Sequence, residues 1–213
     1  MQVDLYWSHD FPFQSFSSNG STGDRLQMLR AESESPTYSY SIGSRFGFTF
    51  PSGMGIKTGL NISKVRTSVS YVETDGMDTT SMSNMVTSNN SYTYVDIPLL
   101  FSWETSGFGP FYYNFNAGIL LNMTFTAEGN FLDENGEITS FTKGVENRVV
   151  AYEETIGTSF YASFGMHYVW NSMLDFVIEP NIRFSPGSIT TSDYPLDEKY
   201  STVGLITGIR YKF

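Results

Sequence analysis

The stretch "FYYNFNAGILLNMTF", residues 111–125, alternates between two kinds of side chain. Every odd-numbered residue from Phe111 to Phe125 is apolar, and all but one of the even-numbered residues are small, polar or tyrosine. A repeat of two residues is typical of a β-strand, because successive side chains of an extended chain point to opposite faces. The pattern therefore predicts a strand with one apolar face and one polar face.

The same alternation returns in seven further segments. In "YSYSIGSRFGFTF", residues 38–50, Ile42, Phe46 and Phe48 share one face, whereas Gly43 and Arg45 lie on the other. The eight predicted strands are Val3–Trp7, Tyr38–Phe50, Met54–Ile62, Tyr92–Trp103, Phe111–Phe125, Ile156–Tyr168, Leu174–Phe184 and Ser201–Phe213.

The connections between these strands are alternately long and short. Three of them are short, residues 51–53, 105–110 and 169–173. The long connections are rich in Ser, Thr, Asn, Asp and Glu, and they cover residues 10–37, 72–91, 128–154 and 186–200. This order predicts an up-and-down antiparallel sheet with the four long loops at one end and both termini at the other. No linker is visible, so residues 1–213 are expected to form one domain.

The polar face of the predicted strands decides which solvent the sheet meets. A soluble barrel shows water a face rich in Lys and Glu, but here the polar face consists of Gly, Ser, Thr, Asn and Tyr with a few charges. The apolar face is bulky, and its aromatic residues lie near strand ends, as lipid contact requires. Strands of about 9–11 residues can cross a bilayer when tilted, and closure removes every unpaired edge. We therefore predict an all-β, eight-stranded transmembrane barrel with periplasmic termini and extracellular long loops, over a lipocalin-like soluble barrel.

Composition and charge agree with an outer-membrane location. Charged residues make up 16% of the chain, there is no Cys, and no apolar run is long enough for a membrane-spanning helix. The start, "MQVDLYWSHD", lacks the regions of a signal peptide, so we expect a mature exported chain or, alternatively, a cytoplasmic one. The long connections hold 17 of the 22 acidic residues. An acidic face argues against nucleic acid as a partner.

A second group of charges is predicted to point into the barrel. By the alternation it consists of Arg45, Lys57, Asp96, Glu179, Arg183 and Arg210, with positive charge in excess. An eight-stranded barrel is just wide enough for side chains to fill it, and buried charges must be paired. We therefore expect a network of Arg–carboxylate pairs that stabilises a closed lumen.

Several motifs that suggest chemistry fail on spacing. "SGMGIKTG", residues 52–59, does not fit a phosphate-binding loop, and "DENGEI", residues 133–138, does not fit a calcium loop. Asn135-Gly136 is better explained as a hairpin tip. His9 and His167 are expected near opposite ends of the barrel, and "SHD", residues 8–10, cannot converge within a strand. We therefore predict no catalytic residues, no metal site and no cofactor.

Three short segments resemble known outer-membrane proteins. The last residues, "GIRYKF", resemble the C-terminal signature of bacterial outer-membrane barrels, which implies that Phe213 and Tyr211 form the signal read by the barrel-assembly machinery. "YVDIPLLF" (residues 94–101) is similar to the Tyr-x-Glu-Ile-Pro-Leu-Leu segment of PorT-like barrels of Bacteroidetes, with Asp96 where Glu is commoner. "IEPNIRFS" (residues 178–185) is similar to their penultimate strand. The pattern as a whole is that of PorT-like or OmpX-like eight-stranded barrels.

These observations predict a non-enzymatic outer-membrane protein with outer-membrane lipids and the barrel-assembly machinery as partners. Its long acidic loops suggest a binding or scaffold protein, and the PorT-like resemblance implies an accessory subunit of a type IX secretion-like complex. A projecting strand edge within residues 128–154 could capture a protein partner by strand addition. The alternatives are a lipid-modifying enzyme of the outer membrane and a narrow channel for small solutes.

Overall fold

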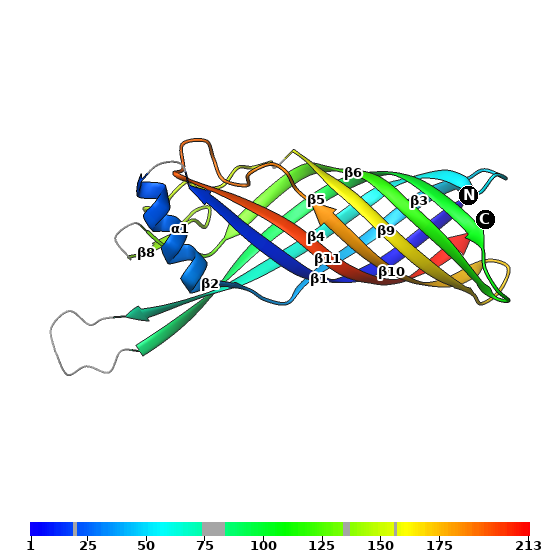
Figure 1. Cartoon of the computed structure of the whole chain (residues 1–213), viewed down its shortest axis with the longest axis horizontal. Coiled ribbons are helices and arrows are strands. Elements are labelled where there is room, and N and C mark those ends of the chain that lie inside the picture. Colours follow the sequence, from blue (N-terminus) through cyan, green and yellow to red (C-terminus); the bar gives the residue numbers. More distant parts are fainter. Residues whose placement is uncertain (19–20, 74–83, 134–136, 156) are drawn as a thin grey trace.

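Eight antiparallel strands close into a ring. The computed structural model describes residues 1–18, 21–73, 84–133, 137–155 and 157–213. Each strand of the ring pairs with its neighbour in the chain, and the first pairs with the last, which confirms the up-and-down barrel (Figure 1). The ring consists of β1 (Gln2–Ser18), β3 (Ser39–Thr49), β4 (Met54–Glu73), β5 (Asn84–Ser106), β6 (Phe111–Glu128), β9 (Thr158–Val169), β10 (Leu174–Phe184) and β11 (Leu196–Lys212).

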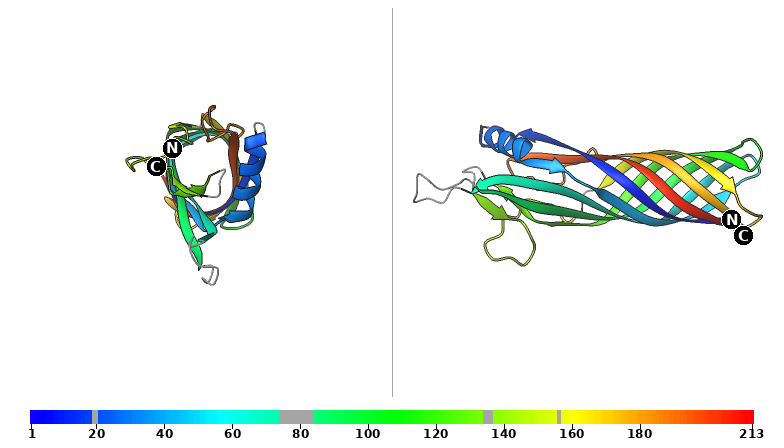
Figure 2. Two further views of the ribbon diagram at one scale, coloured as in Figure 1. Left: turned by 90° about the vertical axis from the view of Figure 1, so that its left-hand side faces the viewer. Right: turned by 90° about the horizontal axis from the view of Figure 1, so that it is seen from below.

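Both termini lie at the end of the barrel that carries the short turns, the predicted periplasmic end (Figures 1 and 2). The turn from β3 to β4 needs a glycine, because Gly53 has a φ of 83° and a Cβ there would lie 2.4 Å from the Glu104 carbonyl oxygen. "SGMGIKTG" is thus a turn that leads into β4, as its lack of a phosphate-loop pattern indicated. The long connections gather at the opposite, extracellular end.

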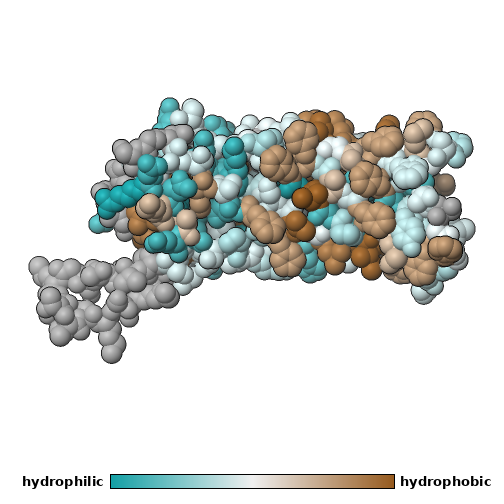
Figure 3. Space-filling model, in the orientation of Figure 1, coloured by the Kyte–Doolittle hydropathy of each residue, from teal (hydrophilic) through white to brown (hydrophobic). Residues whose placement is uncertain are grey.

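A belt of exposed apolar side chains surrounds the half of the barrel near the termini. Figure 3 shows these side chains in brown, with hydrophilic side chains gathered toward the extracellular end. The side chains of Leu60 and Phe101 are 45% and 50% exposed, whereas large apolar residues in the core of a water-soluble protein are buried. No helix in the described residues is long and apolar enough to cross a membrane.

Four strands, β1, β4, β5 and β11, extend well beyond the predicted boundaries into the long connections. β1 continues to Ser18 and is followed by a helix, α1 (Ser21–Ser33), and a short strand, β2 (Glu34–Pro36), that pairs with β4. β4 and β5 continue as a two-stranded ribbon that leans outward from the extracellular end of the barrel, away from α1 (Figures 1 and 2). Strand pairing continues on the extracellular side of the belt because it satisfies the hydrogen bonds of backbone N–H and C=O groups in water as well as in lipid.

The remaining loop segments fold into a cap over the extracellular end. A hairpin of β7 (Asn130–Leu132) and β8 (Ile138–Ser140) is present, although its predicted tip at Asn135-Gly136 lies outside the described residues. The hairpin packs inward instead of projecting as expected. The cap and the upper strands share one apolar core, formed by Leu26, Val65, Tyr92, Tyr94, Phe125, Phe131, Phe141, Ala151, Ile189, Tyr194, Leu196 and Tyr200.

The predicted face assignment of β6 is wrong from Thr124 onward. Phe125 is buried in the cap core, although the alternation from Phe111 placed it on the outer, apolar face. The register between β5 and β6 shifts beside Asp96, where Val95 is opposite Thr124 but Asp96 is opposite Asn122. The extra residue, Met123, is a β-bulge, and a bulge moves every later side chain to the other face.

The belt predicts a position-dependent cost for charge on the outer surface. Leu60→Arg should lower the free energy of unfolding by about 2–4 kcal/mol, because its cation would be placed in lipid. Met28→Arg is the matched control, since Met28 is 69% exposed on α1 in the extracellular cap. Urea unfolding in lipid vesicles measures both. Equal effects of the two changes would contradict the assignment of the belt to lipid.

Candidate functional site: the charged lumen and the cap

The lumen near the termini holds a charge cluster centred on Arg210 of β11. Its guanidinium donates to both oxygens of Asp4, at 2.6 and 3.0 Å, and to Oε1 of Glu104 at 2.5 Å. Lys57 approaches the same Asp4 carboxylate at 3.6 Å. The two carboxylates offset the positive excess that the sequence led us to expect, so this end of the lumen is close to electrically balanced.

Arg45 of β3 and Glu179 of β10 form the next layer. Nη1 of Arg45 donates to Glu179 at 2.7 Å, and Nη2 donates to the Tyr161 hydroxyl at 2.7 Å. The guanidinium lies over the ring of Tyr6, 4.4 Å from its centre. A planar, weakly hydrated cation suits this position because carboxylate and aromatic rings surround it on all sides.

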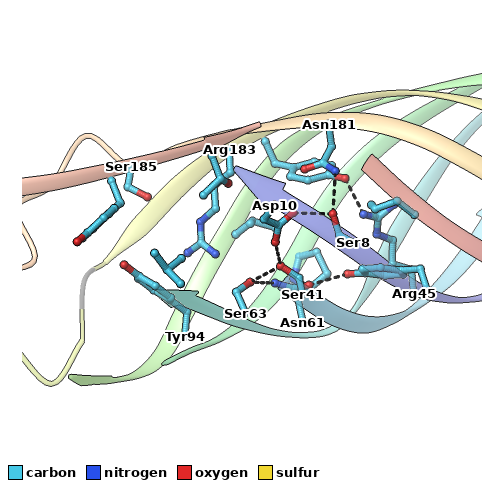
Figure 4. A pocket seen from close by; sticks show the side chains of 18 residues that line it. Ser8, Asp10, Ser41, Arg45, Asn61, Ser63, Tyr94, Asn181, Arg183 and Ser185 are labelled. Carbon is cyan, nitrogen blue, oxygen red and sulfur yellow. Dashed lines mark hydrogen bonds between the residues drawn. The ribbon is translucent and has the colours of Figure 1, made fainter. Parts of the chain in front are cut away.

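A layer of small polar side chains follows toward the extracellular end (Figure 4). Ser8 donates to Asp10 at 2.6 Å, and Ser41 also donates to the Asp10 carboxylate. Asn61 donates to Ser63 at 2.8 Å. These groups, together with Arg45 on one side and Arg183 on the other, line a cavity of about 30 Å³, which has room for about one or two water molecules.

Arg183 of β10 and Asp96 of β5 pair across the barrel above this cavity. Nη1 and Nη2 of Arg183 donate to the two oxygens of Asp96 at 2.7 and 3.3 Å, and the guanidinium lies 4.9 Å from the centre of the Tyr94 ring. Asn122 donates to the same carboxylate at 2.9 Å. The two segments that resemble PorT-like barrels, residues 94–101 and 178–185, therefore meet through this ion pair.

The structure thus places all six predicted charges in the lumen and distributes them over three levels. Arg45, Lys57, Asp96, Glu179, Arg183 and Arg210 are each at least nine-tenths buried. Asp4 and Glu104 belong to the same network but were missed, although the alternation of β1 and β5 places both on the polar face.

A further ion cluster, inside the cap, has no counterpart in the sequence predictions. Arg30 of α1 is fully buried and donates to Glu34 at 2.6 and 3.1 Å. It also forms an ion pair with Glu198 of β11 at 2.9 Å and lies 4.8 Å from the centre of the Phe16 ring. The Tyr152 hydroxyl joins the cluster by donating to Glu198 at 2.9 Å. The cluster fastens α1 and the loop before β9 to the barrel wall.

Burial and the shared arginine set the protonation of this cluster. Burial raises the pKa of Glu34 above its usual value, and the neighbouring Glu198 carboxylate adds to this effect, whereas Arg30 opposes it. Burial alone would lower the pKa of Arg30, but Glu198, Tyr152 and Glu34 outweigh it and raise that pKa well above its usual value. Arg30 therefore stays charged and holds two carboxylates that repel each other.

The two histidines lie at different levels of the barrel, but only His167 is near an end as expected, because His9 lies midway along β1. His9 faces outward on β1 and hydrogen-bonds the Tyr38 hydroxyl at 3.0 Å, whereas Ser8 and Asp10 face the lumen. His167 is buried near the termini and stacks on Tyr112, with ring centres 4.5 Å apart. Within the described residues, no group of three or more His, Asp or Glu side chains is arranged to hold a metal ion.

The predicted assembly signal lies on the outer surface at the end of β11. Phe213 is 78% exposed, and its ring packs edge-on against Tyr211 with centres 4.9 Å apart. The Tyr211 hydroxyl also lies 3.5 Å from the sulfur of Met173. Recognition of this pair by the barrel-assembly machinery stays a prediction.

Fold and lumen together define a class of protein, the bacterial outer-membrane β-barrel. The family described as "Outer membrane protein beta-barrel domain" matches residues 11–212 of this sequence. The chain belongs to this family, and its location is the bacterial outer membrane.

Solved structures of other outer-membrane proteins are similar to this chain at low sequence identity. Neisserial surface protein A (NspA) is similar with a TM-score of 0.52 and 10% identity, over 100% of this chain and 96% of that chain. OprG from Pseudomonas aeruginosa has a TM-score of 0.48 and 12% identity, over 100% and 95% of the two chains. The first similarity supports the barrel fold and nothing finer. No curated protein matches the sequence significantly.

Removal of one partner of the upper lumen pair should be costly. Asp96→Ala leaves the Arg183 guanidinium buried without its carboxylate, and breaking such a pair costs about 3–5 kcal/mol. The free energy of urea unfolding in lipid vesicles measures the loss. Glu146→Ala, at an exposed position of the cap, is the control and should have little effect. A small effect of Asp96→Ala would mean that the pair does not support the barrel.

Glu34→Gln should reduce the pH dependence of stability. Because the folded-state pKa of Glu34 is raised, its stabilising contribution is full below the usual pKa of 4.5 and is lost as the pH rises through the folded value. The wild type should therefore lose stability relative to Glu34→Gln as the pH increases from 4.5. Urea unfolding at a series of pH values measures this, with Glu146→Gln as the exposed control. A constant difference between wild type and Glu34→Gln would contradict the assignment.

Proposed function

We propose that this protein is a non-enzymatic, non-conducting scaffold that binds a protein partner at the cell surface, as a subunit of an outer-membrane complex. The observation that carries the proposal is the β4–β5 ribbon, which leans outward from the extracellular end of the barrel and away from α1 (Figure 2). Its pairing extends from Ser68↔Asn89 outward to Glu73↔Asn84. On the outer edge of β4, β2 pairs only with residues 67–69. On the outer edge of β5, β6 pairs only from Ser91 toward the barrel. Past these residues, neither edge of the ribbon is paired with another strand in the described part of the chain.

An exposed strand edge offers a row of backbone donors and acceptors to an incoming strand. The ribbon is also anchored, because its base belongs to the barrel wall and Val69 is fully buried there. A preorganised edge loses little freedom on binding, which favours affinity. The binding edge is therefore assigned to residues 70–73 and 84–89, in place of the β7–β8 hairpin that the sequence suggested.

The side chains that fill the lumen favour a scaffold function rather than a channel function. Three levels of paired charges and the apolar cap core occupy the interior in series, and each pair would have to separate before a solute could pass. The lipid-modifying alternative would need His9 to act with Ser8 and Asp10, but β1 places His9 on the opposite face. The resemblance of residues 94–101 and 178–185 to PorT-like barrels adds support for a subunit role.

A photo-crosslinking residue at Thr87, exposed on the ribbon, should yield a discrete crosslinked protein in native membranes. The same residue at Glu146 in the cap is the control and should not yield that product. In planar bilayers, the purified protein should give no steady single-channel current. Crosslinking from Glu146 but not from Thr87 would contradict the ribbon assignment, and steady currents would replace the scaffold with a channel.

A further inference from the structure

Two cations lie side by side on the outer surface of β4, directly above the apolar belt. Lys64 and Arg66 face outward, as do Leu60 and Ile62 below them, whereas the intervening Ser63 and Val65 are buried. The change from apolar to cationic thus occurs within one face of one strand. In an outer-membrane barrel, this boundary is the level of the lipid headgroups.

Aromatic side chains confirm that level and hold Arg66 in place. The guanidinium of Arg66 lies 5.7 Å from the centre of the Tyr40 ring, and Tyr40 stacks on Trp7 with ring centres 4.9 Å apart. Tyr and Trp concentrate at membrane–water interfaces. A guanidinium that already rests on a ring loses less freedom when it binds an anion.

Hydroxyl groups continue the polar surface to the next strands. The register places Lys64 between Tyr40 of β3 and Thr93 of β5, and Thr93 is opposite Thr126 of β6. Neither Lys64 nor Arg66 forms an ion pair with a carboxylate in the described part of the chain. Arg66 is opposite Ser91 of β5, which is opposite Glu128 of β6, so this outward-facing acidic residue lies two strands away from Arg66. Both cations are therefore available to an external anion.

We propose that Lys64 and Arg66 bind the phosphate of an outer-leaflet lipid whose acyl chains lie against Leu60 and Ile62. A lipid fits better than a soluble anion because the protein has a net charge of −10, concentrated in the cap, which repels anions approaching from water. A headgroup anchored in the leaflet reaches the two cations from the membrane side. Arg66 can form paired hydrogen bonds with phosphate oxygens, and Lys64 adds a point charge.

The test is lipid binding by native mass spectrometry, with diphosphoryl lipid A and its dephosphorylated form as probes. The double variant Lys64→Gln/Arg66→Gln should lose about tenfold or more in affinity for the diphosphoryl form, since each cation near a membrane surface contributes about fivefold. Lys143→Gln/Arg148→Gln is the matched control, because it removes the same charge from exposed positions in the cap. Lys64→Arg should retain binding. Circular dichroism and unboiled gel migration establish that each variant is folded.

Four results would overturn the proposal. These are an unchanged affinity in the Lys64/Arg66 variant, an equal loss in the Lys143/Arg148 control, equal binding of both lipid forms, and displacement of the lipid by inorganic phosphate at a comparable concentration. The last result would assign the two cations to a soluble anion. None of them depends on the partner proposed for the ribbon, so the two proposals can fail separately.

Discussion

The need to satisfy every backbone hydrogen bond in lipid is the constraint on which this structure depends. An open sheet would leave two edges in the hydrocarbon, so β1 must pair with β11, and it does so over its whole length from Gln2 to Ser18. The number of strands sets the diameter of a closed barrel, and eight strands give a narrow interior. Everything that points inward must then fit this interior and be paired within it.

The lumen shows how that demand is met. Arg45 pairs with Glu179, Arg183 pairs with Asp96, and Arg210 reaches Glu104, in each case between strands that are not hydrogen-bonded neighbours. These ion pairs tie separate parts of the barrel wall together, whereas the Arg210–Asp4 pair strengthens the contact between the neighbouring strands β11 and β1. The same side chains fill the lumen, so the stability of the barrel and its filled interior have one physical origin.

Beyond the belt, the barrel behaves like a water-soluble domain. The strands continue past the lipid, and α1, the β7–β8 hairpin and the loop before β9 supply an apolar core around Tyr92 and Phe131. Arg30 binds these parts to Glu198 on the wall. The β4–β5 ribbon leans away from this cap, whereas Lys64 and Arg66 lie lower, at the edge of the apolar belt. The surfaces proposed for a protein partner and for lipid are therefore separate.

The sequence by itself determined the strand number, the barrel, the lipid-facing belt and the six inward charges. It could do so because a period of two records which face of a strand each side chain occupies, whatever the strand's neighbours are. Asp4 and Glu104 were also accessible to that rule. The side chain of Phe125 was not, because a single-residue bulge at Met123 is set by the pairing of β5 with β6.

Only the tertiary structure decided which charges pair, because the partner of Arg45 lies 134 residues away in the chain and is brought close by closure alone. The same holds for the cap. The long connections have a polar composition, which did not indicate an apolar core. The apolar residues of the cap core are scattered singly through residues 26–200, and they form a cluster only after the strands have brought their connections together. Local patterns record local geometry, and contacts between distant segments depend on how the ring closes.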